Sequence, residues 1–431
     1  MQTLSKIASF LKSALKVITF PLFALLILYE KLYRRQQQQC TFKSYQDPCL
    51  ENQQEIKEKK GDLLGDDGKL VCCGWSRNTM FDYNPSALSL YQRMFRLKEW
   101  SYYAVGSETF YFAVAAVDLG YAINYQTFYI DYENPANTRK DQVVIPGFFR
   151  RGRFMPKDSC LAGNHIQYNS KSFKIHFHVN DHPLEEEEEE GSSSTNHQHG
   201  ECTTKMLTNE SKHLHFIEMA SEKMKTKVKM EFDVSPTRES MVLATRIGEN
   251  KFYYNRKTNL IPVKGSLLVD GVEHLSDQYD GNRHSFGILD WGRGVWEYNS
   301  FWIWCTTWKR MDDGRTIGFN FGSGFGDLRS HTENCVNIDG VIHKLGHVEI
   351  KYNKDNLQSP WTFTCPHGRF GDAPITFTPI TKKLEVENFI VVSSHFSQII
   401  GHFAGTVILD NGEKITFDNM YGFSEVHYAR W

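Results

Sequence analysis

Alternating apolar and polar residues, broken by turn signals, run through most of this 431-residue chain after about residue 61. The segment 100–129 consists almost entirely of aromatic, β-branched and small residues, and Gly106 and Gly120 divide it. Such a segment predicts three or four antiparallel strands in a meander. Residues 172–180, SFKIHFHVN, place apolar side chains on one face and polar ones on the other, which predicts a half-exposed strand.

The same pattern continues through the second half of the chain. Strands are expected in 240–279 and in several runs after residue 345. Turn signals such as Asp270-Gly271 and Asn411-Gly412 separate apolar runs, as in β-hairpins. The pattern predicts an all-β fold, with one β half at residues 61–235 and another at 236–431.

One apolar run differs from the rest: residues 7–29, IASFLKSALKVITFPLFALLILY. A membrane-spanning helix needs roughly 20 apolar residues, and this run reaches that length if Lys16 extends its ammonium group to the interface. We therefore expect a hydrophobic helix within residues 1–35 and a polar linker at 36–60. Three interpretations stay open: a single-pass signal anchor, a mitochondrial targeting peptide, and a monotopic or core helix. The first and third predict a membrane location, with the compartment undecided.

Charge and cysteine content exclude several classes of partner. Lys and Arg total 49 against 51 for Asp and Glu, so the net charge of −2 predicts no nucleic-acid partner. Nine cysteines, with no CxxC pair, favour reduced thiols and exclude the usual structural zinc site. Glycines in the segment 315–327 follow a strand pattern with no helix after them, so they do not form a dinucleotide fingerprint. We expect no bound metal and no cofactor.

An insertion interrupts the first β half. Residues 181–210 contain six consecutive glutamates, which repel one another and predict a disordered loop at the tip of a hairpin. Two His-x-His pairs flank the insertion, His176 with His178 and His213 with His215. They would bind a metal only if the strand register brought both pairs to one face; otherwise they are exposed histidines on a sheet.

The segment from Leu289 to Cys335 concentrates aromatic, glycine and charged residues. Six of the nine tryptophans lie between residues 291 and 361, with ionisable residues among them. If 289–298 formed a tight loop around its glycines, the backbone could approach a ligand closely. Asp290 and Arg293 are the obvious local ion pair, because a buried charge needs a partner. Two interpretations stay open: a structural network, or a pocket in which His284 or Asp290 exchanges a proton.

Several co-linear motifs resemble one known family. They are GWSR, RLKEW, AVDLGY, DWGRGVWEY, GFNFG, TENC, a Lys-Leu pair, PW and a terminal GxxE, and together they cover about residues 64–431. In this order they resemble the uncharacterised family of unknown function 2804. That family is distantly similar to lipocalin-like, two-barrel proteins that include carotenoid hydratases and tocopherol cyclases. The resemblance implies two lipocalin-like antiparallel sheets or barrels and assigns no activity.

An aromatic cavity with a few polar groups is the usual form of a small-molecule site. The candidate catalytic residues are His284, Asp290 and Glu333. The candidate ligand-binding residues are Trp291, Arg293, Trp296, Trp302, Trp308, Asn320 and Asn334. We predict a membrane-tethered protein that binds an apolar small molecule, a lipid or an isoprenoid. The alternatives are an enzyme that uses acid or base chemistry to hydrate or cyclise such a molecule, and a structural subunit of a membrane assembly.

Overall fold

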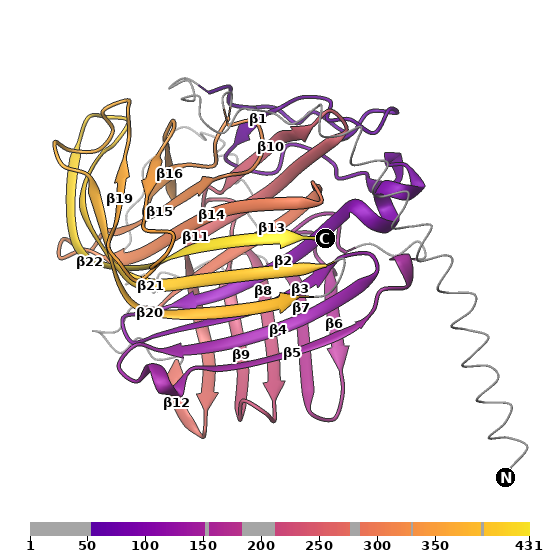
Figure 1. The fold of residues 1–431 in the computed structure, drawn as a ribbon, viewed down its shortest axis with the longest axis horizontal. Helices are drawn as coiled ribbons and strands as arrows, with labels where there is room; N and C mark the ends of the chain where they lie inside the picture. The colour runs from indigo at the N-terminus through magenta and orange to yellow at the C-terminus, as the bar shows by residue number, and fades with distance from the viewer. Residues whose placement is uncertain (1–52, 151–154, 183–211, 276–284, 329–330, 389–391) are drawn as a thin grey trace, which may run out of the picture. The chain divides into compact units, whose positions relative to one another are not determined.

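The computed structural model describes residues 53–150, 155–182, 212–275, 285–328, 331–388 and 392–431, and these form two curled antiparallel sheets (Figure 1). The predicted all-β class is confirmed. The expected N-terminal helix, its membrane segment 7–29 and the acidic insertion lie outside the described residues, except for Asp181 and His182 at the end of β7. Among the residues that are described, every helical segment is a short turn, and none has the length and apolar character that a membrane-spanning helix needs.

The first sheet contains thirteen strands. Its strands are β1 (Gly74–Ser76), β2 (Leu97–Gly106), β3 (Phe110–Asp118), β4 (Ala122–Asp131), β5 (Arg139–Pro146), β6 (His165–Asn169), β7 (Phe173–His182), β8 (Lys212–Ser221), β9 (Thr226–Asp233), β10 (Met241–Gly248), β11 (Lys251–Val269), β12 (Val272–Leu275) and β13 (Phe286–Val295). The main path of the sheet follows the order β5-β4-β3-β2-β13-β11-β9-β8-β7-β6. The meander predicted at 100–129 is therefore confirmed as β2, β3 and β4.

The second sheet contains nine strands, in the order β17-β16-β15-β14-β22-β21-β20-β19-β18. Its strands are β14 (Asn299–Arg310), β15 (Thr316–Ser323), β16 (Cys335–Ile338), β17 (Val341–Lys344), β18 (Glu349–Lys351), β19 (Trp361–Thr364), β20 (Ile375–Asn388), β21 (Ser393–Ile408) and β22 (Lys414–Arg430). Short helical turns lie at η2 (Pro85–Ala87), η3 (Gln92–Arg96), η4 (Pro135–Asn137) and η5 (Phe148–Arg150). The chain passes from the first sheet to the second between β13 and β14, whereas the division at residues 235 and 236 stays a prediction.

The long strand β11 produces the curl of the first sheet. Its first part pairs with β10 and β13, and its second part pairs with β9 and β12. The register shifts between Thr258 and Ile261, where Leu260 has a positive φ of 57°. Further along, Gly265 has a φ of 126°, and a Cβ there would lie 2.1 Å from the carbonyl oxygen of Lys229. The bend therefore requires glycine at this position.

Each sheet packs one face on a core of its own and the other face on its neighbour. Inside the first sheet, Leu289 and Val295 of β13 join a large apolar cluster. Inside the second, Phe319 and Phe403 belong to a separate cluster. A third cluster contains side chains of both sheets and holds their outer faces together. Strand β13 is buried along its whole length because both of its faces are covered.

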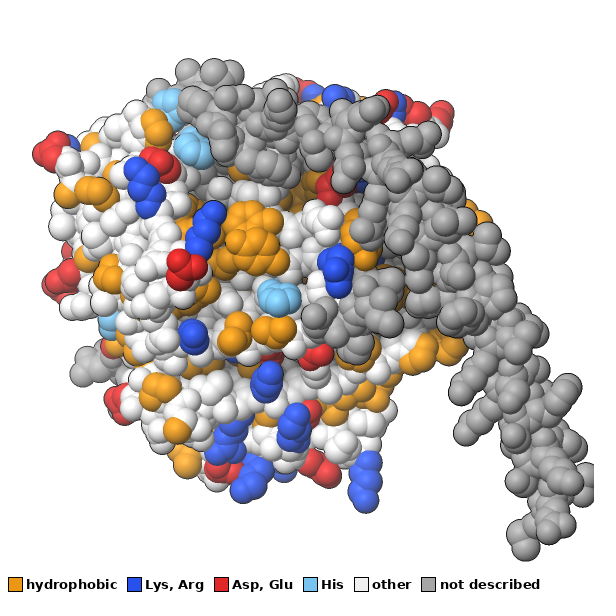
Figure 2. Space-filling view, viewed as in Figure 1, with side chains coloured by type: hydrophobic (Ala, Val, Ile, Leu, Met, Phe, Trp, Pro, Cys, Tyr) orange, Lys and Arg blue, Asp and Glu red, His pale blue; other side chains and the backbone are white. Residues whose placement is uncertain are grey.

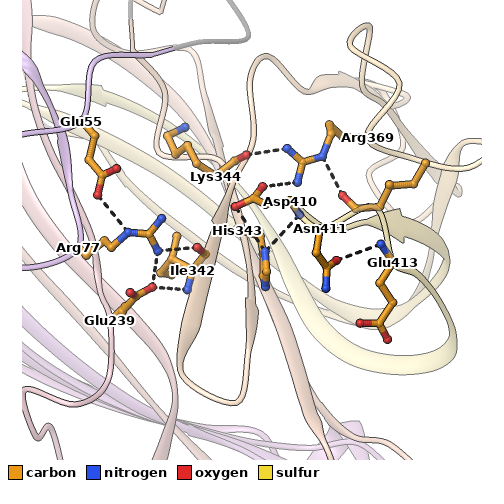
Figure 3. A network of polar contacts seen from close by, with 11 residues as sticks. Glu55, Arg77, Glu239, Ile342, His343, Lys344, Arg369, Asp410, Asn411 and Glu413 are labelled. Atoms are coloured by element: carbon orange, nitrogen blue, oxygen red, sulfur yellow. Dashed lines mark hydrogen bonds and ion pairs between the residues drawn. The ribbon is translucent and has the colours of Figure 1, made fainter.

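A polar network also fastens the sheets at β17 (Figure 3). Arg77, from the GWSR motif beside β1, donates to the carbonyl oxygen of Ile342 at 2.7 Å and forms ion pairs with Glu55 and Glu239. Glu239 in turn accepts the backbone N–H of Ile342 at 2.6 Å. One guanidinium group thus joins the start of the first sheet to the edge of the second.

Replacement of Arg77 by Met should lower the free energy of unfolding by about 2 kcal/mol, because Glu239 and the Ile342 carbonyl would lose a partner that is partly shielded from water. Urea denaturation followed by tryptophan fluorescence measures the change. Lys59→Met is the matched control, since its ion pair with Asp82 is mostly exposed and should contribute less than about 0.5 kcal/mol. Equal effects of the two variants would contradict this role of Arg77.

Candidate functional site

A cavity of about 550 Å³ lies between the two sheets. Strands β2–β5, β11 and β13 form one wall, and β14 and β20–β22 form the other. Its lining includes exposed residues, such as Gln142 and Glu387, which hydrogen-bond across the sheets at 3.4 Å and mark the opening. It also includes Lys257, Asp290 and Glu425, which are almost fully buried. The volume lies within the range of sites for small molecules.

Aromatic rings form most of the inner wall. They belong to Trp100, Tyr102, Phe128, Tyr253, Trp296, Trp302, Trp304, Phe325, Phe396 and Trp431. Gly292 makes room for one of them, because a Cβ at that position would lie 2.1 Å from the ring of Trp100. The indole N–H of Trp296 is buried and has no hydrogen-bond partner among the described residues. That nitrogen lies against Gly294, where a Cβ would be only 2.8 Å from it.

The polar centre of the cavity surrounds the ammonium group of Lys257. Its Nζ lies 3.6 Å from Oδ2 of Asp290 and 3.3 Å from Oε1 of Glu333. It also lies 3.7 Å from the ring centroid of Trp304. Glu425 of β22, beside Trp304 in the strand register, accepts a hydrogen bond of 2.8 Å from the indole of Trp302. One cation thus contacts a carboxyl group of the first sheet, Asp290, and one from the segment that leads into β16 of the second sheet, Glu333.

Burial raises the pKa of all three carboxyl groups, because a low-dielectric interior disfavours charge. The pKa of Glu425 rises to about 7, since burial outweighs the opposing hydrogen bond from Trp302 and the attraction of Lys257. For Asp290 and Glu333, Lys257 opposes the same upward shift in pKa. Near neutral pH, Glu425 exists as both acid and carboxylate, so it can donate or accept a proton.

Strands β20–β22 add two further titratable groups. Burial lowers the pKa of Lys383 to about 8, although the Glu385 carboxylate, 3.3 Å away, acts to raise it. The ammonium group of Lys383 also lies 3.3 Å from the ring centroid of Phe128. Burial also lowers the pKa of His427 to about 3, so that imidazole is neutral at pH 7. Nε2 of His427 lies 2.8 Å from Oγ of Ser394, and both residues line the cavity.

The structure brings some predicted site residues together. Asp290, Trp296 and Trp302 line the cavity, and Glu333 contacts Lys257. Asn320 accepts the indole N–H of Trp304 at 2.7 Å and donates to the Glu333 carbonyl at 2.8 Å. Among the predicted residues, Asn320 therefore positions cavity groups without lining the cavity itself.

Two other candidates, Asn334 and Trp308, stabilise the structure around the site. Asn334 accepts the N–H of Gly322 and donates to the carbonyl of Gly346, both at 2.9 Å. Trp308 donates to the carbonyl of Ser107 at 3.0 Å and stacks on Tyr111, which joins the two sheets. His284 lies outside the described residues. The roles proposed for these residues in binding or catalysis stay predictions.

The expected tight loop at 289–298 is wrong. Most of it belongs to the regular strand β13, whose neighbouring side chains point to opposite faces. Asp290 faces the cavity, whereas Trp291 and Arg293 face the core inside the first sheet. The expected ion pair between Asp290 and Arg293 is not formed, because residues three apart in a strand lie on opposite faces. Arg293 lies instead 3.7 Å from Glu99 and stacks over Trp291.

Two residues of the polar centre were absent from the sequence-based candidates, Lys257 and Glu425. Glu425 belongs to the terminal GxxE motif, GFSE, and that motif was a usable signal. Lys257 follows Asn255 and Arg256 in a strand pattern and carries no signal of its own. Its role depends on the register of β11 against β13, which pairs it with Asp290.

The two His-x-His pairs lie on opposite faces of the first sheet. The register pairs His178 with Phe216 and Val179 with His215, and paired residues share a face. Hence His176 and His178 stack on each other on one face of the sheet. His213 and His215 lie on the opposite, inward face, which they share with Val179. In the described part of the chain, no group of three or more His, Cys, Asp or Glu side chains is arranged to hold a metal ion.

Replacement of Glu425 by Gln should change how stability depends on pH. Because the pKa of Glu425 rises from 4.5 to about 7 on folding, the wild type should lose about 3 kcal/mol of stability from this group between those pH values. His427, with its lowered pKa, changes the stability in the opposite direction over this pH range. The informative quantity is therefore the free energy of unfolding of the variant minus that of the wild type at each pH. That difference should rise as the pH rises from 4.5 to 7 in urea denaturation.

The control for this pH experiment is Glu387→Gln, at the exposed opening of the same cavity. Its difference from the wild type should not depend on pH in this window. A flat difference for Glu425→Gln as well would show that the Glu425 carboxyl is not held in its neutral form.

Comparisons with known proteins bear on the family and not on the activity. No curated protein matches the sequence. Similar solved structures include a protein of Nitrosomonas europaea provisionally named AttH, with 11% identity and a TM-score of 0.34 over 77% of this chain and 92% of that one. Another is CghA, with 9% identity and a TM-score of 0.34 over 78% of this chain and 88% of that one. Similarity this low supports no argument about function.

The family assignment rests on a match over most of the chain. The model of the domain of unknown function DUF2804 matches residues 53–431. This range contains both sheets and every residue that lines the cavity. The family indicated by the motifs is confirmed: the chain belongs to the DUF2804 family.

Proposed function

We propose that this protein binds a largely apolar small molecule, of the lipid or isoprenoid class, in the cavity between its two sheets. The observation that carries the proposal is an aromatic cavity of about 550 Å³ with Lys257, Asp290 and Glu425 in its lining. Apolar walls with a few convergent polar groups are typical of small-molecule sites. Rings as large as these also supply a large contact area.

The polar groups favour a ligand with one polar end. Trp100 and Lys257 both interact with the Asp290 carboxyl, but one of its oxygens, Oδ1, has no partner in good hydrogen-bond geometry among the described residues. A buried polar atom without a partner carries a free-energy cost that a ligand hydroxyl or carbonyl group would remove. The polar end of the ligand would therefore lie near Asp290, with its apolar part against the tryptophans.

The face of the protein shown in Figure 2 gives no sign of a broad electrostatic partner. On the face in Figure 2, Lys and Arg side chains are interspersed with Asp and Glu, and hydrophobic side chains lie between them. This agrees with the net charge of −2 for the whole chain. Recognition would therefore depend on the cavity. The membrane tether predicted from residues 7–29 stays part of the proposal.

A second candidate function is acid–base catalysis on the same ligand. One observation favours it: burial raises the pKa of Glu425 to about 7 in a cavity that also contains the Asp290 carboxyl. The acid form of Glu425 could protonate a carbon–carbon double bond, as in a hydration or cyclisation. Aromatic faces would stabilise the resulting positive charge, and a basic group in the cavity would take the proton released later.

Replacement of Ala122 by Trp should reduce binding of an apolar probe, because Ala122 is a half-buried residue of the cavity wall. Titration with the neutral fluorophore N-phenyl-1-naphthylamine should give a dissociation constant at least about tenfold higher for the variant than for the wild type. Ala136→Trp is the matched control, since Ala136 is exposed in η4 and outside the cavity lining. Equal binding by all three proteins would overturn the proposed site.

The binding and catalytic candidates differ in the effect of Glu425→Gln. Small molecules should be extracted from the purified full-length chain and from the variant, and identified by mass spectrometry. If the protein only binds, both should contain the same molecule. If it is a catalyst, the variant should retain a precursor that the wild type converts to an isomer or to a product 18 mass units heavier. No extracted molecule from either protein would contradict both candidates.

A further inference from the structure

A second group of reactive side chains lies inside the first sheet, on the opposite face of β11 from Lys257. Its centre is Cys160, a partly exposed free cysteine in the segment before β6. The Arg256 guanidinium donates to the sulfur of Cys160 and, at 3.0 Å, to the hydroxyl of Ser159. Nδ1 of His213 lies 3.1 Å from the Cys160 carbonyl oxygen and can donate to it. These contacts connect the His213/His215 pair to a thiol.

His215 has the arrangement expected of a group that interacts with this thiol. Its side chain is fully buried, and Nδ1 lies 2.8 Å from the hydroxyl of Tyr103. Its other nitrogen, Nε2, has no hydrogen-bond partner among the described residues. If the Tyr103 hydroxyl donates to Nδ1, the imidazole proton is on Nε2 and can be donated to a thiolate. A buried N–H without an acceptor is costly, and the Cys160 sulfur, whose pKa a hydrogen bond from His215 lowers, can accept this one.

The charges around Cys160 favour the thiolate. Burial raises the pKa of the Cys160 thiol. Arg256, followed by His213 and His215, lowers this pKa by more than burial raises it, so the pKa lies well below its ordinary value. Asp158 is the nearest carboxylate on the same segment, and it accepts the backbone N–H of Cys160 at 2.7 Å. The charged or titratable groups in this environment are Tyr103, Asp158, His213, His215, Arg256 and Arg293.

A small cavity lies beside this cluster, and Cys160 itself is partly exposed. The cavity has a volume of about 20 Å³, and Tyr103 and Ser159 are among its lining residues. Such a volume admits a water molecule or a molecule of similar size.

We propose that Cys160 is a peroxide-reactive site, at which hydrogen peroxide oxidises the sulfur to a sulfenic acid. In this step the thiolate sulfur attacks one peroxide oxygen and the O–O bond breaks. Sulfur is oxidised, the peroxide is reduced, and the hydroxide that leaves takes a proton from solvent to form water. Arg256 and His215 stabilise the thiolate before the attack, and Tyr103 is a positioning residue that acts through His215. This site is separate from the ligand cavity and does not depend on its function.

The test uses the full-length chain and iodoacetamide at substoichiometric concentration, from pH 5 to pH 9. Peptide mass spectrometry then gives the alkylation rate of each cysteine. At pH 6, Cys160 should react at least about tenfold faster than the partly buried Cys72 and Cys365, because only a stabilised thiolate is ionised there. Treatment with hydrogen peroxide and dimedone should label Cys160 first. A Cys160 rate equal to or below those of the other two cysteines at pH 6 would overturn the proposal.

Two variants test the positioning argument. Tyr103→Phe keeps the ring that packs on Phe177 and Phe232 but removes the hydroxyl, and His215→Asn removes the imidazole. Both should move the midpoint of Cys160 alkylation to higher pH and leave the rate of Cys72 unchanged. An unchanged midpoint in two folded variants would overturn the role of His215. If neither variant folds, the wild-type comparison at pH 6 decides the proposal by itself.

Discussion

The buried ammonium group of Lys257 is the constraint on which the junction of the two sheets depends. A charge in a dry interior is costly unless it is paired, and Lys257 contacts a carboxyl group of the first sheet, one from the segment that leads into the second, and the face of Trp304. Its partners outnumber it, since Asp290, Glu333 and Glu425 are all buried. Burial keeps the pKa values of all three carboxyl groups high, and the charge of Asp290 adds to the rise at Glu333 and Glu425. The same contacts therefore join the sheets and create groups that can exchange protons.

This arrangement gives the first sheet two chemically different faces. Along β11, Lys257 points toward the cavity, while its neighbour Arg256 points into the sheet's own core toward Cys160. The backbone alternation of a single strand thus separates an acidic ligand cavity from a basic thiol environment. Because the backbone of the sheet lies between them, each site can have its own chemistry. Strand β13 repeats the separation, with Asp290 and Arg293 on opposite faces.

Much of the fold could be predicted from the alternation of apolar and polar residues, which has a period of two residues in a strand. The strand predicted at 172–180 is β7, and the turn at Asp270-Gly271 is confirmed by positive φ values at both residues, as a tight hairpin requires. The cavity was partly predictable: Asp290, Trp296 and Trp302 line it. The error at 289–298 arose because glycines were interpreted as a loop signal. In the structure, Gly292 instead gives space to the ring of Trp100 from a neighbouring strand.

The sequence by itself determined the local structure: which segments are strands, which side chains share a face of a strand, and to which family the chain belongs. Only the tertiary structure decided which faces meet. Lys257 lies opposite Asp290, and Glu425 lies beside Trp304, through the register of strands that are distant in sequence. His213 and His215 face Cys160 rather than His176 and His178 for the same reason. A shift of one residue in any of these pairings would move every side chain to the other face, and no local pattern contains that information.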